Sequence, residues 1–162
     1  MRTAIYPGTF DPITLGHVDV IQKSLKLFDK IVVAATNTKN KNCFFQIDKR
    51  IEIIKKSLFS DLKFNKKKIS VISFNTLTIN LCKKYNSSVI VRGLRAASDF
   101  EYEFQLAGMN KRLNNNIETI FLMSDVENQV ISSKFVKEIA KLNGNINKFV
   151  TKSVIKFVKE KI

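Results

Sequence analysis

Short apolar runs rich in β-branched residues alternate along the chain with longer segments of helical periodicity, and this alternation restricts the fold more than any other feature. The apolar runs predict five strands, at residues 4–6, 30–35, 69–74, 89–91 and 119–123. Apolar residues three or four positions apart predict helices over residues 16–28, 48–59, 77–85, 100–113, 133–142 and 152–161. Strands that alternate with helices form parallel sheets covered on both faces. We therefore expect an α/β fold with a Rossmann-like open five-stranded parallel sheet, in a single domain over residues 1–162.

Turn-forming and polar residues indicate where some of these elements begin and end. Pro7 followed by Gly8 is expected to end the first strand, and Arg92 followed by Gly93 is expected to end the fourth. Asp48 belongs to a residue type that caps helices, so we expect it to cap the second helix.

The formal net charge of +14 would suit a nucleic-acid-binding protein, but the kind of basic residue argues against that class. Only five of the 28 basic residues are Arg, the side chain that binds phosphates and bases bidentately. The Lys66-Lys67-Lys68 run is interpreted as a solvated loop. We expect no nucleic-acid partner, whereas the positive charge suits a small anionic substrate.

The cysteine and hydropathy patterns exclude several other classes. Cys43 and Cys82 lie outside any CxxC pattern and have no His nearby, so they indicate neither a disulfide framework nor a zinc site. No apolar run approaches the roughly 20 residues that cross a bilayer. The first residues do not resemble a secretory signal. We expect a cytoplasmic protein with no membrane partner.

The loops that follow the strands are the places to look for a site, because ligands of open parallel sheets bind at the carboxyl ends of the strands. Neither the GxxxxGK(S/T) nor the GxGxxG phosphate-binding pattern is present. In the first loop, Gly16 is expected to leave room for a ligand at the start of a helix, whose N–H groups favour an anion. His17, the only His in the chain, would lie in the first turn of that helix.

The first loop resembles the signature of the nucleotidyltransferase superfamily. Gly8-Thr9-Phe10-Asp11-Pro12 is followed by Thr14-Leu15-Gly16-His17, which matches the (H/T)xGH motif of that superfamily. Within that superfamily, the Thr in the first motif position and the chain length resemble those of the phosphopantetheine adenylyltransferases. That family makes dephospho-coenzyme A and pyrophosphate from ATP and 4′-phosphopantetheine. The resemblance spans essentially the whole chain and implies a homohexamer.

A second stretch, Arg92-Gly93-Leu94-Arg95 followed by Asp99-Phe100-Glu101-Tyr102-Glu103, is similar to the RGLR…DFEYE stretch of the same family. The two guanidinium groups suit phosphate oxygens. The resemblance implies that Arg92 binds phosphopantetheine. It implies that ATP is contacted by Gly93, Leu94, Arg95 and Glu103. A surface Arg pair bridged to Asp99 and Glu101 is the structural alternative.

Two further loops carry family contact positions. The resemblance assigns substrate binding to Lys41, in the loop after the second strand, and to Thr78, at the start of the third helix. The last loop matches the ISS(S/T) helix start of the family. There the resemblance implies ATP contacts from Asn128, Gln129, Val130, Ile131, Ser132, Ser133 and Lys134. Asn128 replaces a usual aromatic residue and Lys134 a hydroxyl, and simple capping by the two Ser residues is equally open.

These assignments lead to a mechanism without a general base, because the attacking phosphate is already an anion. Thr9 would orient that phosphate, and Lys41 and Arg92 would hold it. His17 would stabilise the charge that grows on the α-phosphoryl oxygens, and Thr9, Phe10 and His17 would also contact ATP. Mg²⁺ is expected to arrive on the triphosphate, since the sequence shows no carboxylate cage, and no metal site is assigned to the chain.

Two other functions stay open at this point. One is a sibling transferase that uses another acceptor, such as nicotinamide mononucleotide or an alcohol phosphate; those relatives usually have His where this chain has Thr14. The other is a basic nucleic-acid binder without catalysis. In the helix after Arg95, one side carries Tyr102, Leu106, Met109 and Asn110, which either pack in the core or line the pantetheine arm.

Overall fold

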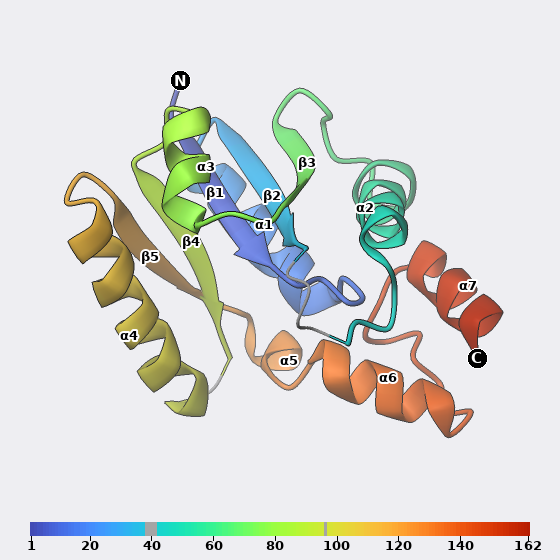
Figure 1. Ribbon diagram of the computed structural model, residues 1–162. Helices are drawn as coiled ribbons and strands as arrows, with labels where there is room; N and C mark the ends of the chain where they lie inside the picture. The colour runs from blue at the N-terminus through green and yellow to red at the C-terminus, as the bar shows by residue number, and fades with distance from the viewer. Residues whose placement is uncertain (38–41, 96) are drawn as a thin grey trace.

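The computed structural model describes residues 1–37, 42–95 and 97–162, and its centre is one five-stranded sheet (Figure 1). All strand pairs are parallel, in the order β3-β2-β1-β4-β5. The strands are β1 (Thr3–Gly8), β2 (Lys30–Thr36), β3 (Ile69–Phe74), β4 (Val89–Leu94) and β5 (Glu118–Met123). The predicted fold class is confirmed, and β3 has the predicted bounds.

Helices cover both faces of the sheet (Figure 1). They are α1 (Leu15–Leu27), α2 (Ile47–Lys55), the π-helical η1 (Lys56–Asp61), α3 (Thr78–Lys84), α4 (Ala97–Leu113), α5 (Val126–Gln129), α6 (Ser133–Lys141) and α7 (Lys152–Lys161). Because strand side chains alternate between faces, Ala4 and Tyr6 pack in the core that α1, α2, α6 and α7 complete. Ile5 points the other way and packs against Ile79 and Cys82 of α3.

The central strands separate toward their carboxyl ends. β1 pairs with β4 only at Ala4 and Ile5, whereas its pairing with β2 continues through Pro7 and Gly8. The expectation that Pro7-Gly8 ends the strand is therefore wrong. Pro7 is tolerated in a central strand because β1 has no β4 partner there, so its missing N–H breaks no ladder on that side.

The fourth strand is also longer than expected. Arg92 and Gly93 do not end β4 but pair in register with Phe121 and Leu122 of β5. Membership in a strand fixes the direction of the Arg92 side chain, because successive side chains alternate between faces. The parallel order reverses between β1 and β4, so the gap between them is the switch point at which such sheets bind ligands.

The start of α2 differs from the expectation as well. The helix begins at Ile47 with Gln46 at its N-cap, and no side chain caps it. Asp48 lies in the first turn rather than at the cap, because the N–H of Arg50 bonds to the Gln46 carbonyl and starts the helix earlier. The short helix α5 lies in a segment that we expected to be a loop. The sequence does not predict this helix because four residues are too few to show a helical period.

None of the helices within residues 1–37, 42–95 and 97–162 combines the length and apolarity needed to cross a membrane.

Gly93 lets α1 pack closely on β4, and this contact gives a stability prediction. A Cβ at Gly93 would lie 2.9 Å from Cγ2 of Val20. We expect Gly93→Ala to lower the free energy of unfolding by about 1–3 kcal/mol in urea titrations. Gly108→Ala is the control, because nothing lies within 4 Å of its Cβ position.

The double variant Gly93→Ala/Val20→Ala relieves the same contact. It should lose less stability than the sum of the two single variants, because the new methyl enters the space that Val20 leaves. Strict additivity would show that the Val20 contact does not explain the effect.

Candidate active site

A cavity of about 1160 Å³ opens at the carboxyl ends of β1 and β4, where these strands separate. Its walls are the loop after β1, the end of β4, the first turns of α4, and the segment from the end of β5 into α6. Segments far apart in the sequence therefore meet at the switch point of the sheet.

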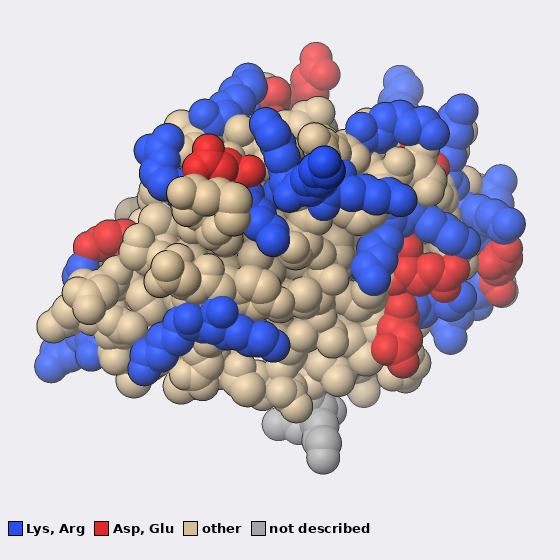
Figure 2. Space-filling model, turned by 90° about the horizontal axis from the view of Figure 1, so that it is seen from above, with Lys and Arg blue, Asp and Glu red and all other residues tan. Residues whose placement is uncertain are grey.

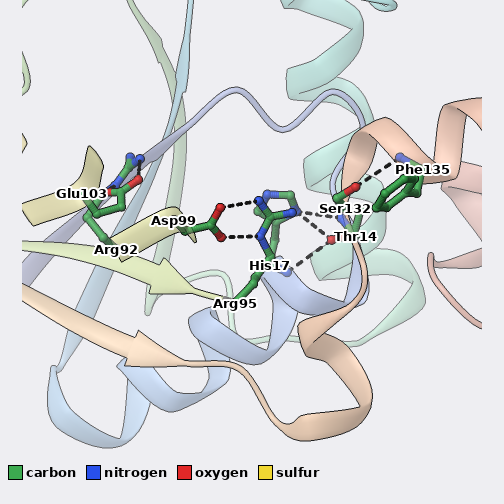
Figure 3. A network of polar contacts seen from close by, with 8 residues as sticks. All are labelled: Thr14, His17, Arg92, Arg95, Asp99, Glu103, Ser132 and Phe135. Atoms are coloured by element: carbon green, nitrogen blue, oxygen red, sulfur yellow. Dashed lines mark hydrogen bonds and ion pairs between the residues drawn. The ribbon is translucent and has the colours of Figure 1, made fainter. Parts of the chain in front are cut away.

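His17 is held at the start of α1 by a reciprocal cap with Thr14 (Figure 3). The N–H of Thr14 donates to Nδ1 of His17 at 3.0 Å, and Thr14 Oγ1 accepts from the N–H of His17 at 3.4 Å. Because Nδ1 accepts this bond, the proton of the neutral ring is assigned to Nε2. Nε2–H is then the donor that the ring retains, and His17 lines the cavity.

The environment keeps His17 neutral. Burial, followed by the positive charges of Arg95 and Arg92, lowers the pKa of His17 to about 4. At neutral pH the side chain is therefore an uncharged hydrogen-bond donor rather than a cation. Arg92 and Arg95 line the same cavity as His17, and their positive charges act on its ring.

The lowered pKa makes stability depend on pH in a defined window. Below pH 6.5 the unfolded chain protonates His17, whereas the folded chain resists protonation until about pH 4, so unfolding becomes easier as the pH falls through this range. From pH 7 to 4.5, we expect the unaltered chain to lose about 2 kcal/mol more stability than His17→Asn. Urea titrations at both pH values measure this difference, and equal losses would contradict the shifted pKa.

Arg92 and Glu103 form a bidentate ion pair at the cavity wall (Figure 3). Nε and Nη2 of Arg92 donate to the Glu103 carboxylate at 2.7 and 2.5 Å, and Nη1 donates to the Pro7 carbonyl at 2.7 Å. Burial alone would lower the pKa of Arg92, but the Glu103 carboxylate outweighs it and holds that pKa above its usual value. Three of the five guanidinium N–H groups are engaged, so two are left to bind an anion.

Arg95 makes a more open pair. Its Nε and Nη2 donate to Asp99 at 3.1 and 3.3 Å, and the Arg95 side chain is 40% exposed. The sequence analysis left open that Arg92 and Arg95 form surface ion pairs with Asp99 and Glu101. This alternative is right for Arg95, which pairs with Asp99. It is wrong for Arg92, which pairs with Glu103 and not with Glu101.

The start of α6 forms the wall opposite these arginines. Ser132 is the N-cap of α6, and its Oγ accepts from the N–H of Phe135 at 3.1 Å (Figure 3). Ser133 Oγ donates to the Pro12 carbonyl at 2.8 Å and so joins α6 to the first loop. The capping alternative is thus correct for Ser132, yet a hydroxyl that accepts keeps its own hydrogen for a ligand.

Comparisons with known proteins identify the family. The Cytidylyltransferase-like family model matches residues 5–139. The phosphopantetheine adenylyltransferase of Pelagibacter ubique is 69% identical over 160 residues, which cover 99% of this chain and 98% of that protein. The chain belongs to the phosphopantetheine adenylyltransferase family. The enzyme of that name from Sphingopyxis alaskensis is 49% identical, over 98% of this chain and 92% of its own.

A solved structure shows the same fold at low sequence identity. It is a putative nicotinate-nucleotide adenylyltransferase from Vibrio parahaemolyticus, with a TM-score of 0.69 and 15% identity, covering 98% of this chain and 99% of its own. The chain is thus a nucleotidyltransferase of the phosphopantetheine adenylyltransferase family, as the sequence resemblance implies.

Most of the residues assigned from the family resemblance line the cavity described above. They are Thr9, Phe10, His17, Arg92, Gly93, Arg95, Glu103, Gln129, Val130, Ile131, Ser132, Ser133 and Lys134. Leu94, Thr78 and Asn128 are described but do not line it: Leu94 pairs with Met123 at the end of β4, and Thr78 begins α3. Lys41 lies outside the described residues.

Gly16 lines the cavity, as expected, and it has a second role in packing. A Cβ there would lie 3.2 Å from the Asn128 carbonyl oxygen and 3.6 Å from that of Ile131, so Gly16 also lets the segment after β5 approach α1. The expectation of core packing is wrong for Tyr102 and Met109, because these side chains are 65% and 59% exposed. Of the four residues singled out on that side of α4, only Tyr102 lines the cavity.

A network between α1 and the end of β5, outside the lining of the cavity, escapes sequence reasoning. Asp19 of α1 is buried and accepts from the N–H of Asp125 at 2.6 Å. Lys23 Nζ donates at 2.7 Å to both the Asp125 carboxylate and the Met123 carbonyl. These bonds fix the end of β5 against α1. The only sequence signal is the Asp19–Lys23 spacing of four residues, which is common on exposed helices.

Proposed function

We propose that the chain transfers the adenylyl group of ATP to 4′-phosphopantetheine, giving dephospho-coenzyme A and pyrophosphate. The observation that carries the proposal is the cavity in which one neutral imidazole and two guanidinium groups lie together. Family membership supplies the substrate pair. A phosphate oxygen of phosphopantetheine forms a bond to the α-phosphorus. The bond from that phosphorus to the β-bridging oxygen then breaks, and pyrophosphate leaves with the electron pair.

Each side chain has a role that follows from its charge and donors. Nε2–H of His17 donates to an α-phosphoryl oxygen, whose charge grows in the transition state. The two remaining Arg92 N–H groups, Thr9 and Lys41 hold the attacking phosphate. No proton has to be removed from this phosphate, so a neutral His17 that donates is sufficient.

The ATP phosphates would be held on the opposite wall. Lys134, the Ser132 hydroxyl and the main-chain N–H of Ser133 bind the β- and γ-phosphates at the N-terminus of α6, where the helix dipole also favours anions. Arg95 binds the same phosphates from the facing wall. Gly93, Glu103, Gln129, Val130 and Ile131, which line the cavity, contact the remainder of ATP. Lys134 is 79% exposed and its nearest carboxylate, Glu138, lies 4.0 Å away, so its ammonium is available to a phosphate.

Mg²⁺ would enter on the ATP phosphates. Within the described ranges no group of three or more His, Cys, Asp or Glu side chains could hold a metal ion. Phosphate oxygens and water are the ligands that Mg²⁺ commonly keeps in such complexes.

The direct test compares acceptors. The purified chain is incubated with ATP, Mg²⁺ and either 4′-phosphopantetheine, nicotinamide mononucleotide or nicotinate mononucleotide, and both pyrophosphate and the adenylylated product are quantified. We expect turnover with 4′-phosphopantetheine only. Turnover with a mononucleotide alone would favour the sibling transferase, and salt-sensitive RNA binding without any turnover would favour the nucleic-acid alternative.

The face shown in Figure 2 bears on the nucleic-acid alternative. On this face, Lys and Arg side chains lie in several separate areas rather than along the one stripe that nucleic-acid binding commonly uses. Both cysteines, Cys43 and Cys82, are free, which suits the reducing cytoplasm in which we place the protein.

We also propose that the chain assembles into a homohexamer. On α4, Phe100, Tyr102, Phe104, Met109 and Leu113 are each between 47% and 65% exposed. Exposed apolar residues gathered on one element are typical of protein–protein contacts. Sedimentation velocity should give six times the chain mass, and Phe104→Asp should shift the protein toward smaller species. A monomer at micromolar concentration would refute the assembly.

A further inference from the structure

Arg50 carries a buried charge that the proposed mechanism does not use. It lies in the second turn of α2 and is 3% exposed. Its hydrogen bonds go to main-chain carbonyls: Nε donates to Phe45 at 3.1 Å, and Nη1 donates to Thr9 at 2.7 Å and to Thr36 at 2.9 Å. One planar guanidinium therefore joins the first loop, the end of β2 and the approach to α2.

Asp11 completes this connection from the opposite side. Its carboxylate, also buried, accepts from the N–H groups of Phe44 and Phe45 at 2.6 and 2.8 Å, and from Lys137 Nζ at 3.2 Å. The main chain of Phe45 is thus held twice, at its N–H by Asp11 and at its carbonyl by Arg50. We call these contacts the Asp11–Arg50 clamp.

The clamp acts on the residue between its two anchor points. Phe10 lies between Thr9, whose carbonyl Arg50 binds, and Asp11. Its φ of 48° is in the left-handed region, which a bulky side chain adopts only where the surrounding structure enforces it. In this conformation the Phe10 ring is buried and packs 5.0 Å from the His17 ring and 5.3 Å from the Tyr6 ring, centroid to centroid.

We propose that Arg50, together with Asp11, is a positioning residue for adenylyl transfer. It fixes the backbone of the first loop so that Thr9 faces the attacking phosphate and Phe10 supports the ring of His17. The inference rests on the proposed function. It predicts an effect on kcat more than on the KM for ATP. The side-chain hydrogen bonds of Arg50 reach Phe45, Thr9 and Thr36, and not the segments around Arg95 and Ser132 that hold the ATP phosphates.

Arg50→Lys is the sharpest variant, because it keeps the charge and removes the fork. A single ammonium nitrogen cannot occupy the positions of both Nε and Nη1, so at least one carbonyl loses its donor. Displacement of reacting groups by about 1 Å costs on the order of 10²-fold in rate. We expect kcat to fall by about that factor and the KM for ATP to stay within threefold. Arg2→Lys, the same exchange at an exposed side chain, is the control.

A second readout does not depend on activity. His17 is the only His, so its ¹⁵N resonances report on one ring. In Arg50→Lys we expect a displaced Nε2 resonance in the folded protein, and in Arg2→Lys an unchanged one. A kcat within twofold of the unaltered chain, with only a lower melting temperature, would overturn the proposal, because Arg50 would then act on stability alone.

Asp11→Asn keeps the test decisive if Arg50→Lys does not fold. The amide retains one acceptor oxygen and loses the pair with Lys137, so a smaller loss of kcat in the same direction is expected. An unchanged kcat in Asp11→Asn would also overturn the proposal. The two hypotheses fail separately: an unaltered chain that makes no dephospho-coenzyme A refutes the proposed function, whereas an active Arg50→Lys refutes only the clamp.

Discussion

Replacing His17 by Asn is expected to lower kcat by about 10²–10³-fold while the protein stays folded. The Asn oxygen can occupy the place of Nδ1 and accept the N–H of Thr14, so the cap of α1 is retained. What is lost is the Nε2–H donor that faces the cavity. Steady-state kinetics with ATP and 4′-phosphopantetheine, together with thermal melting, separates the two effects.

His17→Gln provides the matched control. Its amide nitrogen lies near the position of Nε2, so it can donate to the same phosphoryl oxygen, although without the ring that packs on Phe10. We expect kcat between those of His17→Asn and the unaltered chain. Equal activity of all three proteins would mean that the imidazole donor takes no part in the reaction.

Replacing Arg92 by Met is expected to damage both stability and activity. Glu103 is 8% exposed, so removal of its partner leaves a carboxylate with little water around it. Breaking such a pair costs about 3 kcal/mol, and loss of the phosphate-binding N–H groups should lower kcat/KM by about 10²-fold or more. Urea titrations and initial rates measure the two losses.

A double variant separates these two consequences. In Arg92→Met/Glu103→Leu no unpaired carboxylate remains, so most of the stability should return, whereas the activity should not. Arg95→Met should behave differently, because the Arg95–Asp99 pair is exposed and contributes at most about 1 kcal/mol. Recovery of activity in the double variant would show that Arg92 serves only to neutralise Glu103.

The sequence predicts the layers of this fold because each layer has a local cause. Buried parallel strands need continuous apolar runs such as Ile31 to Ala35, and amphipathic helices need a three- to four-residue period, so both patterns are visible in single segments. The placement of His17 follows equally locally, since it depends only on where α1 begins.

What the sequence does not predict depends on contacts between distant segments. The length of β4, and with it the direction of Arg92, is decided by pairing with β5. The Arg92–Glu103 pair follows from the path between β4 and α4, and the packing role of Gly16 from the carbonyl of Asn128 packed against it. Arg50 appears in the sequence as an ordinary polar residue of a helix, yet its side chain donates hydrogen bonds to Phe45, Thr9 and Thr36, which lie outside that helix.

The central claim is that the imidazole of His17 is neutral, carries its proton on Nε2, and donates a hydrogen bond from Nε2–H to the bound nucleotide. Because the chain contains one His, ¹⁵N-histidine labelling and a long-range ¹H–¹⁵N spectrum observe that ring alone. We expect a protonated Nε2 and an unprotonated Nδ1 at pH 7, no conversion to the imidazolium above pH 5, and a shifted Nε2 resonance when ATP is added. An imidazolium or an Nδ1-protonated ring at pH 7, or a spectrum that ATP leaves unchanged, would contradict it.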